Sequence, residues 1–158
     1  MLNEGSKAPS FAGMDQSGHR IELSALLQKG PVLLYFYPAD FTPICTAQAC
    51  AFRDRAEDLA QHDVQIVGVS PQSEGSHQRF STTYDLPFPL IPDTGKTIIR
   101  SYGVDGPLGF GVRRATFLIG QDGVIRKRVV SDLFVGSHTD FIRSVLEDSS
   151  AAPPEPGP

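Results

Sequence analysis

The sequence predicts an α/β fold, with a central mixed β-sheet flanked by helices. Strand-like and helix-like segments alternate along much of the chain, and a hairpin and a last helix follow. Residues 32–37 are continuously apolar between two prolines, which is typical of a strand covered on both faces. Asp122-Gly123, a strong hairpin signal, lies between two further strand-like segments. This order favours a layered α/β or α+β domain, and a sheet with helices on both faces is its simplest packing.

The length of the chain fits one domain. A chain of 158 residues buries about 68–70% of the surface that its unfolded form exposes. Apolar residues make up 40% and charged residues 20%, which are globular values and exclude collagen, a coiled coil or a wholly disordered chain. We expect a single domain over residues 1–148. Small residues, prolines and one glutamate fill residues 149–158, which predicts a disordered tail.

The elements up to residue 70 follow from caps, prolines and apolar runs. Ser24 and Gly30 are a candidate cap and stop for a short helix. Pro43 is favoured at the first position of a helix, because its missing N–H would be unpaired there anyway, and Thr42 is a candidate cap. We expect strands over 19–23, 32–37 and 64–70, and helices over 24–28 and 43–60.

The second half of the chain continues with shorter elements. Its glycine-rich stretch, with four glycines and a proline over residues 103–112, predicts a loop. The hairpin around Asp122-Gly123 joins two strands, and the final helix is amphipathic. We expect helices over 76–84, 95–102 and 139–147, and strands over 90–91, 115–119 and 124–130.

Charge and hydropathy exclude two classes of partner. Lys plus Arg is 14 and Asp plus Glu is 18, so the net charge is −4, and the chain holds no basic run of the kind that binds nucleic acid. The longest apolar run, residues 32–37, is far shorter than the roughly 20 residues that span a bilayer. The first residues lack the positive charge and apolar stretch of a signal peptide. We therefore expect a cytoplasmic protein that binds neither nucleic acid nor membrane.

Two cysteines, Cys45 and Cys50, are the candidate chemical groups. They are too few for a disulfide-built secreted scaffold, and in a reducing compartment a close pair of thiols is more often catalytic or metal-binding. A zinc site needs about four ligands, and the spacing is not that of a Cys-x-x-Cys oxidoreductase. The histidines show no metal spacing, and we expect them to be solvated or next to helix caps: His19, His62, His77 and His138.

Cys45 follows the buried strand and falls at about the third residue of the next helix. Free backbone N–H groups and the positive end of the helix dipole stabilise a thiolate there. An ordinary thiol is only about 3% ionised at pH 7, and making it mostly thiolate takes roughly 3–4 kcal/mol, of which the helix end supplies ~1. A nearby fixed cation must supply much of the rest. A small buried structural thiol remains the alternative, although the carboxyl edge of a sheet is where α/β proteins place ligand chemistry.

The residues around Cys45 resemble the active-site motif of the peroxiredoxins. The pattern is Pro38-x-x-x-Thr42-x-x-Cys45, and a second cysteine, Cys50, five residues on is the hallmark of the Q-type branch, also called bacterioferritin comigratory proteins. The segments 102–104 and 114–119 resemble the later motifs of this family in order and spacing. The resemblance covers roughly residues 4–147.

The resemblance implies a thioredoxin-like fold and a cysteine-based peroxidase that uses no metal or organic cofactor. It makes Cys45 the peroxidatic nucleophile and Cys50 the resolving cysteine. Thr42 would orient the peroxide through its hydroxyl, and Pro38 would screen the thiolate from water. Arg114 would be the fixed cation, since the Arg-x-Thr-Phe spacing selects it over its neighbour Arg113.

The implied reaction starts with attack of the thiolate on hydrogen peroxide or an organic hydroperoxide and gives a sulfenic acid. An intramolecular Cys45–Cys50 disulfide follows, and thioredoxin or a similar dithiol reductant restores both thiols. Five positions on one helix place the two Cα atoms ~8.7 Å apart, whereas a disulfide needs roughly 6.8 Å or less, so the helix start must unwind. The branch resemblance also implies a monomer or weak dimer.

Some residues depart from the family pattern or allow a second interpretation. Ile44 stands where this branch usually has glycine, which predicts a stiffer loop or a narrower access path. Gln48 is shared with the Q-type branch. Phe41, Ile44 and Phe110 are either an apolar rim that admits alkyl hydroperoxides or ordinary packing residues, and we favour packing. A redox sensor, whose disulfide changes partner binding, and a non-catalytic thioredoxin-fold binding module remain the alternative functions.

Overall fold

A five-stranded mixed sheet in the order β5-β4-β3-β6-β7 forms the centre of the fold. β3 pairs in parallel with β4, which pairs in parallel with β5, whereas β6 is antiparallel to both β3 and β7. The expected α/β class and mixed sheet are therefore confirmed. The computed structural model describes residues 1–151. The strands are β3 (Val32–Phe36), β4 (Gln65–Ser70), β5 (Leu90–Pro92), β6 (Ala115–Ile119) and β7 (Ile125–Val130).

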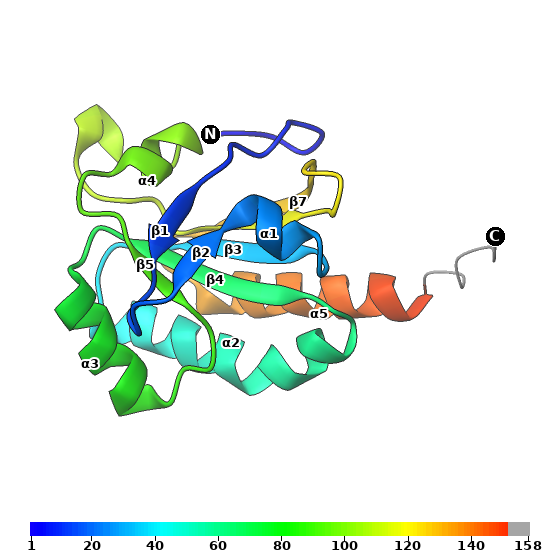
Figure 1. Cartoon of the computed structure of the whole chain (residues 1–158), viewed down its shortest axis with the longest axis horizontal. Coiled ribbons are helices and arrows are strands. Elements are labelled where there is room, and N and C mark those ends of the chain that lie inside the picture. The colour runs from blue at the N-terminus through cyan, green and yellow to red at the C-terminus, as the bar shows by residue number, and fades with distance from the viewer. Residues whose placement is uncertain (152–158) are drawn as a thin grey trace.

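Helices cover both faces of this sheet. Figure 1 shows α2 and α5 side by side below the sheet, whereas α1 and α4 lie above it together with a small antiparallel hairpin. None of the helices within residues 1–151 has the length and apolarity to cross a bilayer. The helices are α1 (Leu23–Leu27), α2 (Pro43–Gln61), α3 (Glu74–Tyr84), α4 (Thr97–Ser101) and α5 (Val135–Ala151), and the hairpin is β1 (Ala12–Met14) with β2 (Arg20–Glu22).

β3 separates two hydrophobic cores, and all five of its residues are buried. Leu34 and Phe36 face the core under α1 and α4, while Leu33 and Tyr35 face the core under α2 and α5. A strand covered on both faces has no polar positions to alternate with apolar ones, which explains the continuous apolar run. β3 ends directly before the loop that leads to Cys45.

The part of α2 that follows Cys50 is held by packing and by a side-chain hydrogen bond. Its buried face includes Phe52 and Leu59, both fully buried, and Arg53 donates a hydrogen bond from Nη1 to the Tyr84 carbonyl at 2.8 Å. α5 packs along the same helix. These contacts lie after Cys50 and hold that part of α2, called here its rear. The front turns, which carry the cysteines, are also buried at Cys45, Gln48 and Ala49.

Several boundaries differ from the expectation. β1 has no counterpart among the expected elements, and α4 is shorter than 95–102. α5 begins at Val135 instead of residue 139. The sequence did not indicate this start, because the first turn carries glycine and serine, which are not typical of an amphipathic helix. It also continues through Ala151, so the first three residues of the tail expected to be disordered are helical. Residues 152–158, the rest of that tail, lie outside the described residues.

Candidate active site

Cys45 lies in the first turn of α2, as the sequence predicts. Pro43 is the first residue of the helix and Thr42 its N-cap, although the Thr42 hydroxyl donates to the Ala39 carbonyl at 3.2 Å rather than to a helix amide. The first helical hydrogen bond runs from the Thr46 N–H to the Thr42 carbonyl at 2.8 Å. The Cys45 N–H precedes this bond and is free to donate to a negative charge. Cys45 itself is only 1% exposed.

Arg114 is the cation that the thiolate argument requires. Its Nη1 lies 3.1 Å from the Cys45 sulfur and also donates to Gln48 Oε1 at 2.8 Å. Arg114 is 4% exposed, so its charge acts on the sulfur with little screening by water. The guanidinium therefore holds a fixed positive charge against the Cys45 sulfur.

The segment after β7 holds Arg114 in this position. The Arg114 N–H donates to Asp132 Oδ1 at 2.9 Å, and its Nε donates to the Asp132 carbonyl at 3.2 Å. Arg113 lies on the outer side, where its Nε donates to Asp132 Oδ2 at 2.8 Å. The two neighbouring arginines thus lie apart: Arg114 contacts the Cys45 sulfur, and Arg113 faces outward. Sequence reasoning did not single out Asp132.

Two buried polar atoms beside the cysteine lack a hydrogen-bond partner among the described residues. They are the Tyr35 hydroxyl and the Gln48 Nε2, and both side chains lie on the α2 side of the sheet. Burial raises the pKa of Tyr35 well above its ordinary value, and the negative charge of Cys45 raises it further. Tyr35 is therefore a neutral hydroxyl whenever Cys45 is a thiolate.

A buried carboxylate fixes the loop between β3 and α2. Asp40 accepts hydrogen bonds from the Tyr37 hydroxyl at Oδ1 and from the Ser76 hydroxyl at Oδ2, both at 2.7 Å. Ser76 belongs to α3, so Asp40 ties the loop to a second helix. The positive φ of this loop falls on Phe41, at 64°, and not on Ile44, which is already helical. The replacement of glycine by Ile44 therefore costs no backbone strain here.

Two of the four histidines are buried, which corrects the expectation that all are solvated or next to caps. His77 and His138 are 0% exposed. His77 Nε2 lies 2.7 Å from the Ser70 hydroxyl, and His138 is bonded at both ring nitrogens. Hydrophobic periodicity counts histidine as polar, so it cannot reveal a histidine whose partners come from other elements. His19 is exposed and His62 is the C-cap of α2, as expected.

We expect the free energy of unfolding to fall as the pH drops below about 6.5. Burial lowers the pKa of both His77 and His138, so the unfolded chain binds their protons before the folded protein does. Their contribution is fully present above the unfolded value of 6.5 and is lost below it, by at most ~1.4 kcal/mol per pH unit for each histidine. Urea unfolding between about pH 5.5 and 7 measures this slope.

Substitution of the two buried histidines tests their part in the pH slope. His77→Gln and His138→Gln should each reduce it. A flat profile for the unsubstituted protein would contradict the expectation.

Cys50 is half-buried and, like Cys45, a free thiol. Both lie on the unbroken helix α2, so the structure does not bring the two sulfurs together. Pro38 is half-buried at the start of the loop. Phe41 is 47% and Phe110 77% exposed, so burial in a core is wrong for both, although Phe41 packs one edge against Phe80 at a ring distance of 5.2 Å.

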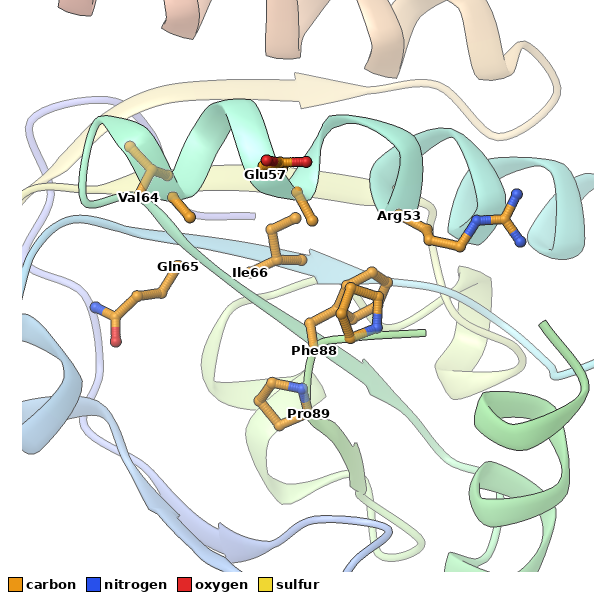
Figure 2. A pocket seen from close by; sticks show the side chains of 10 residues that line it. Arg53, Glu57, Val64, Gln65, Ile66, Phe88 and Pro89 are labelled. Carbon is orange, nitrogen blue, oxygen red and sulfur yellow. The ribbon is translucent and has the colours of Figure 1, made fainter. Parts of the chain in front are cut away.

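A pocket of about 490 Å³ lies away from the cysteines. Figure 2 shows it between the rear of α2, the start of β4 and the segment before β5, with Arg53 and Glu57 on its helix side. Neither cysteine nor Arg114 lines it, so it does not serve the thiol. Its lining residues are Arg53, Ala56, Glu57, Ala60, Val64, Gln65, Ile66, Pro87, Phe88 and Pro89.

Comparison with protein families finds one family over most of the chain. The AhpC/TSA family matches residues 5–128. Chloroplastic peroxiredoxin Q from Populus jackii is 42% identical over 148 residues, which cover 92% of this chain and 68% of that protein. The chloroplastic peroxiredoxin Q of Suaeda salsa is 41% identical over 127 residues, 79% of this chain and 58% of the relative. The chain thus spans little more than half the length of some relatives that it matches.

Solved structures share the fold. Peroxidoxin BcpB from Mycobacterium tuberculosis superposes with a TM-score of 0.87 and 33% identity over 97% of this chain and 100% of its own. Xanthomonas campestris peroxiredoxin Q gives a TM-score of 0.79 and 26% identity over 87% and 89% of the two chains. The expected thioredoxin-like architecture is therefore confirmed.

Proposed function

The chain belongs to the AhpC/TSA family, in its peroxiredoxin Q branch, and on this premise we propose that it is a thiol peroxidase that reduces hydroperoxides at Cys45. The observation that carries the proposal is the 3.1 Å contact between Arg114 Nη1 and the Cys45 sulfur at the start of α2. A buried guanidinium and a helix N-terminus together provide a thiolate and fixed donors for the oxygens of a bound peroxide.

The first step forms an S–O bond and breaks the O–O bond of the peroxide. The Cys45 thiolate attacks one oxygen in line, and the other oxygen leaves as hydroxide or alkoxide and takes up a proton. Negative charge moves from sulfur to oxygen, so donors fixed around both oxygens lower the barrier. We assign these donors to Arg114, the Cys45 N–H and the Thr42 hydroxyl, which must turn from the Ala39 carbonyl to donate to the peroxide. To Pro38 we assign the exclusion of water. The product is a Cys45 sulfenic acid.

The second step joins the two cysteines. The Cys50 thiol attacks the sulfenic sulfur, an S–S bond forms, and water leaves. On the intact helix the two Cα atoms are ~8.7 Å apart, beyond the roughly 6.8 Å limit of a disulfide. The front turns of α2 must therefore unwind, while the rear stays packed through Phe52 and Arg53. Thioredoxin or a similar dithiol then reduces the disulfide by exchange.

We propose that organic hydroperoxides are substrates as well as hydrogen peroxide. A Xanthomonas campestris bacterioferritin comigratory protein was solved to study its alkyl peroxide reduction, and it shares 26% identity with this chain at a TM-score of 0.79. Phe41 directly precedes Thr42 and is 47% exposed, so it offers an apolar surface to an organic group. We further propose that the protein works in the cytoplasm as a monomer or weak dimer, apart from nucleic acid and membrane.

A coupled assay tests the proposed peroxidase. With thioredoxin reductase, thioredoxin and NADPH, hydrogen peroxide should drive continuous NADPH oxidation, and Cys45→Ser should abolish it because no sulfur remains to attack. Oxidation of one thiol equivalent followed by very slow recycling would point to a redox sensor. A lack of peroxide consumption by the unsubstituted protein, with or without reductant, would overturn the proposal in favour of a binding module.

A further inference from the structure

His138 lies on α5, next to the segment that holds Arg114. It is fully buried, its Nδ1 lies 2.8 Å from the Thr116 hydroxyl and its Nε2 lies 3.0 Å from the Ser131 carbonyl. A carbonyl oxygen only accepts, so Nε2 carries the proton and donates it to Ser131. Nδ1 is then the acceptor for the Thr116 hydroxyl. The surroundings therefore select one neutral tautomer of this ring.

The Ser131 carbonyl belongs to the short segment that holds Arg114. The Ser131 N–H donates to the Arg114 carbonyl at 3.1 Å, and the next residue, Asp132, accepts from both the Arg114 N–H and its Nε. The guanidinium in turn reaches the Cys45 sulfur. The His138 ring is thus linked to the thiol through one hydrogen bond to Ser131, the backbone of residues 131–132, and the hydrogen bonds of Arg114.

Burial is the main reason that His138 is neutral. Burial lowers its pKa, and the positive charge of Arg114 lowers it further, whereas the Ser131 carbonyl and Asp132 oppose the shift. A neutral ring fixes the segment without adding a second positive charge next to Arg114. Removal of the ring would free the Ser131 carbonyl to move, and the Asp132 carbonyl would move with it.

We propose that His138 is a positioning residue for the thiol chemistry: through the Ser131 carbonyl it holds the segment that aims Arg114 at Cys45. This rests on the proposed role of Cys45 as the reacting thiol. His138 touches neither the sulfur nor the peroxide. Its effect must therefore show in the ionisation and reactivity of Cys45, and not only in the stability of the fold.

Two amide substitutions separate the two nitrogens of the ring. In His138→Gln the amide nitrogen reaches as far as Nε2 did and can still donate to Ser131, whereas in His138→Asn the shorter amide reaches only as far as Nδ1 did and can still accept from Thr116. We expect His138→Asn to slow the oxidation of Cys45 by hydrogen peroxide about tenfold and to reduce its thiolate fraction at neutral pH. His138→Gln should keep most of both.

Thr116→Val is the matched control. It removes the other hydrogen bond of the same ring, at a fully buried position, and leaves the bond to Ser131 in place. It should destabilise the protein but leave Cys45 oxidation nearly unchanged. Equal slowing by His138→Asn and Thr116→Val, or no slowing by His138→Asn, would overturn the proposal.

Two measurements keep the test separate from folding and from the peroxidase assay. In a Cys50→Ser background, where Cys45 is the remaining thiol, ultraviolet thiolate absorbance against pH reports Cys45 ionisation without any peroxide. It therefore tests the positioning role even if the protein reduces no peroxide. If His138→Asn does not fold, nitrogen-15 spectra of the unsubstituted protein decide between the tautomers. A proton on Nε2 is expected, and a neutral ring protonated on Nδ1 would overturn the bond to Ser131.

Discussion

Replacing Arg114 with Ala is expected to slow the oxidation of Cys45 by hydrogen peroxide about 10²–10³-fold, the usual loss when one fixed donor to a developing oxyanion is removed. Arg114 is the buried cation 3.1 Å from the sulfur, so its loss reduces both the thiolate fraction and the stabilisation of the transition state. Arg114→Lys should restore only part of the rate, because an ammonium is a point charge and cannot replace the planar array of N–H donors of a guanidinium. Stopped-flow kinetics with peroxide and thiolate absorbance against pH measure the two effects.

The neighbouring arginine provides the control for this experiment. Arg113 has the same charge and contacts the same aspartate, but its side chain is 43% exposed and points outward. Arg113→Ala should change the rate little. A large loss in Arg113→Ala would show that net charge rather than the contact with Cys45 matters. An unchanged thiolate fraction in Arg114→Ala would show that the contact does not stabilise the thiolate.

Cys50→Ser should reduce one equivalent of peroxide at a nearly normal rate and then fail to turn over with thioredoxin. The first step needs only Cys45 and its donors, whereas the second needs the Cys50 thiol to displace water from the sulfenic acid. Without it, the Cys45 sulfenic acid should persist and oxidise further to sulfinic acid under excess peroxide. Intact-mass measurement after one and after many equivalents distinguishes these products.

The same reaction tests whether α2 unwinds. The oxidised, unsubstituted protein should show less helix by far-UV circular dichroism than the reduced protein, because a Cys45–Cys50 bond cannot form across an intact helix. Cys50→Ser treated with one equivalent of peroxide should keep its helix content, since no bond pulls on it. Equal helix content in both redox states, with the disulfide mapped by peptide analysis, would contradict the proposed unwinding.

The sequence predicted those helices and strands whose formation depends on neighbouring residues in the chain. Residues 32–37 were recognisable as a central strand because every side chain of β3 is buried. Pro43 marked the first position of α2 by its own chemistry. Arg114 was found through the resemblance, and the need for a cation beside Cys45 followed from the free energy of ionising a thiol.

The features that the sequence did not predict depend mostly on contacts between segments far apart in the chain. Asp132 and His138 lie far along the chain from Arg114, and the β6–β7 register, which pairs Ala115 with Val130, brings Asp132 against it. Hydrophobic periodicity treats both as surface residues. β1 was missed because it has three residues, two of them exposed, so no apolar alternation marks it.

The contacts that hold the rear of α2 have a consequence for the proposed return to the reduced state. A helix that melts completely must form again from its first turn, and this nucleation carries a statistical weight of about 10⁻³, or ~4 kcal/mol. Phe52 and Leu59 keep the rear turns of α2 in place. In the proposed cycle, the front turns would add to an existing helix end by propagation alone once the disulfide is reduced. The rear of α2 would then be a template on which the same segment re-forms without being nucleated again.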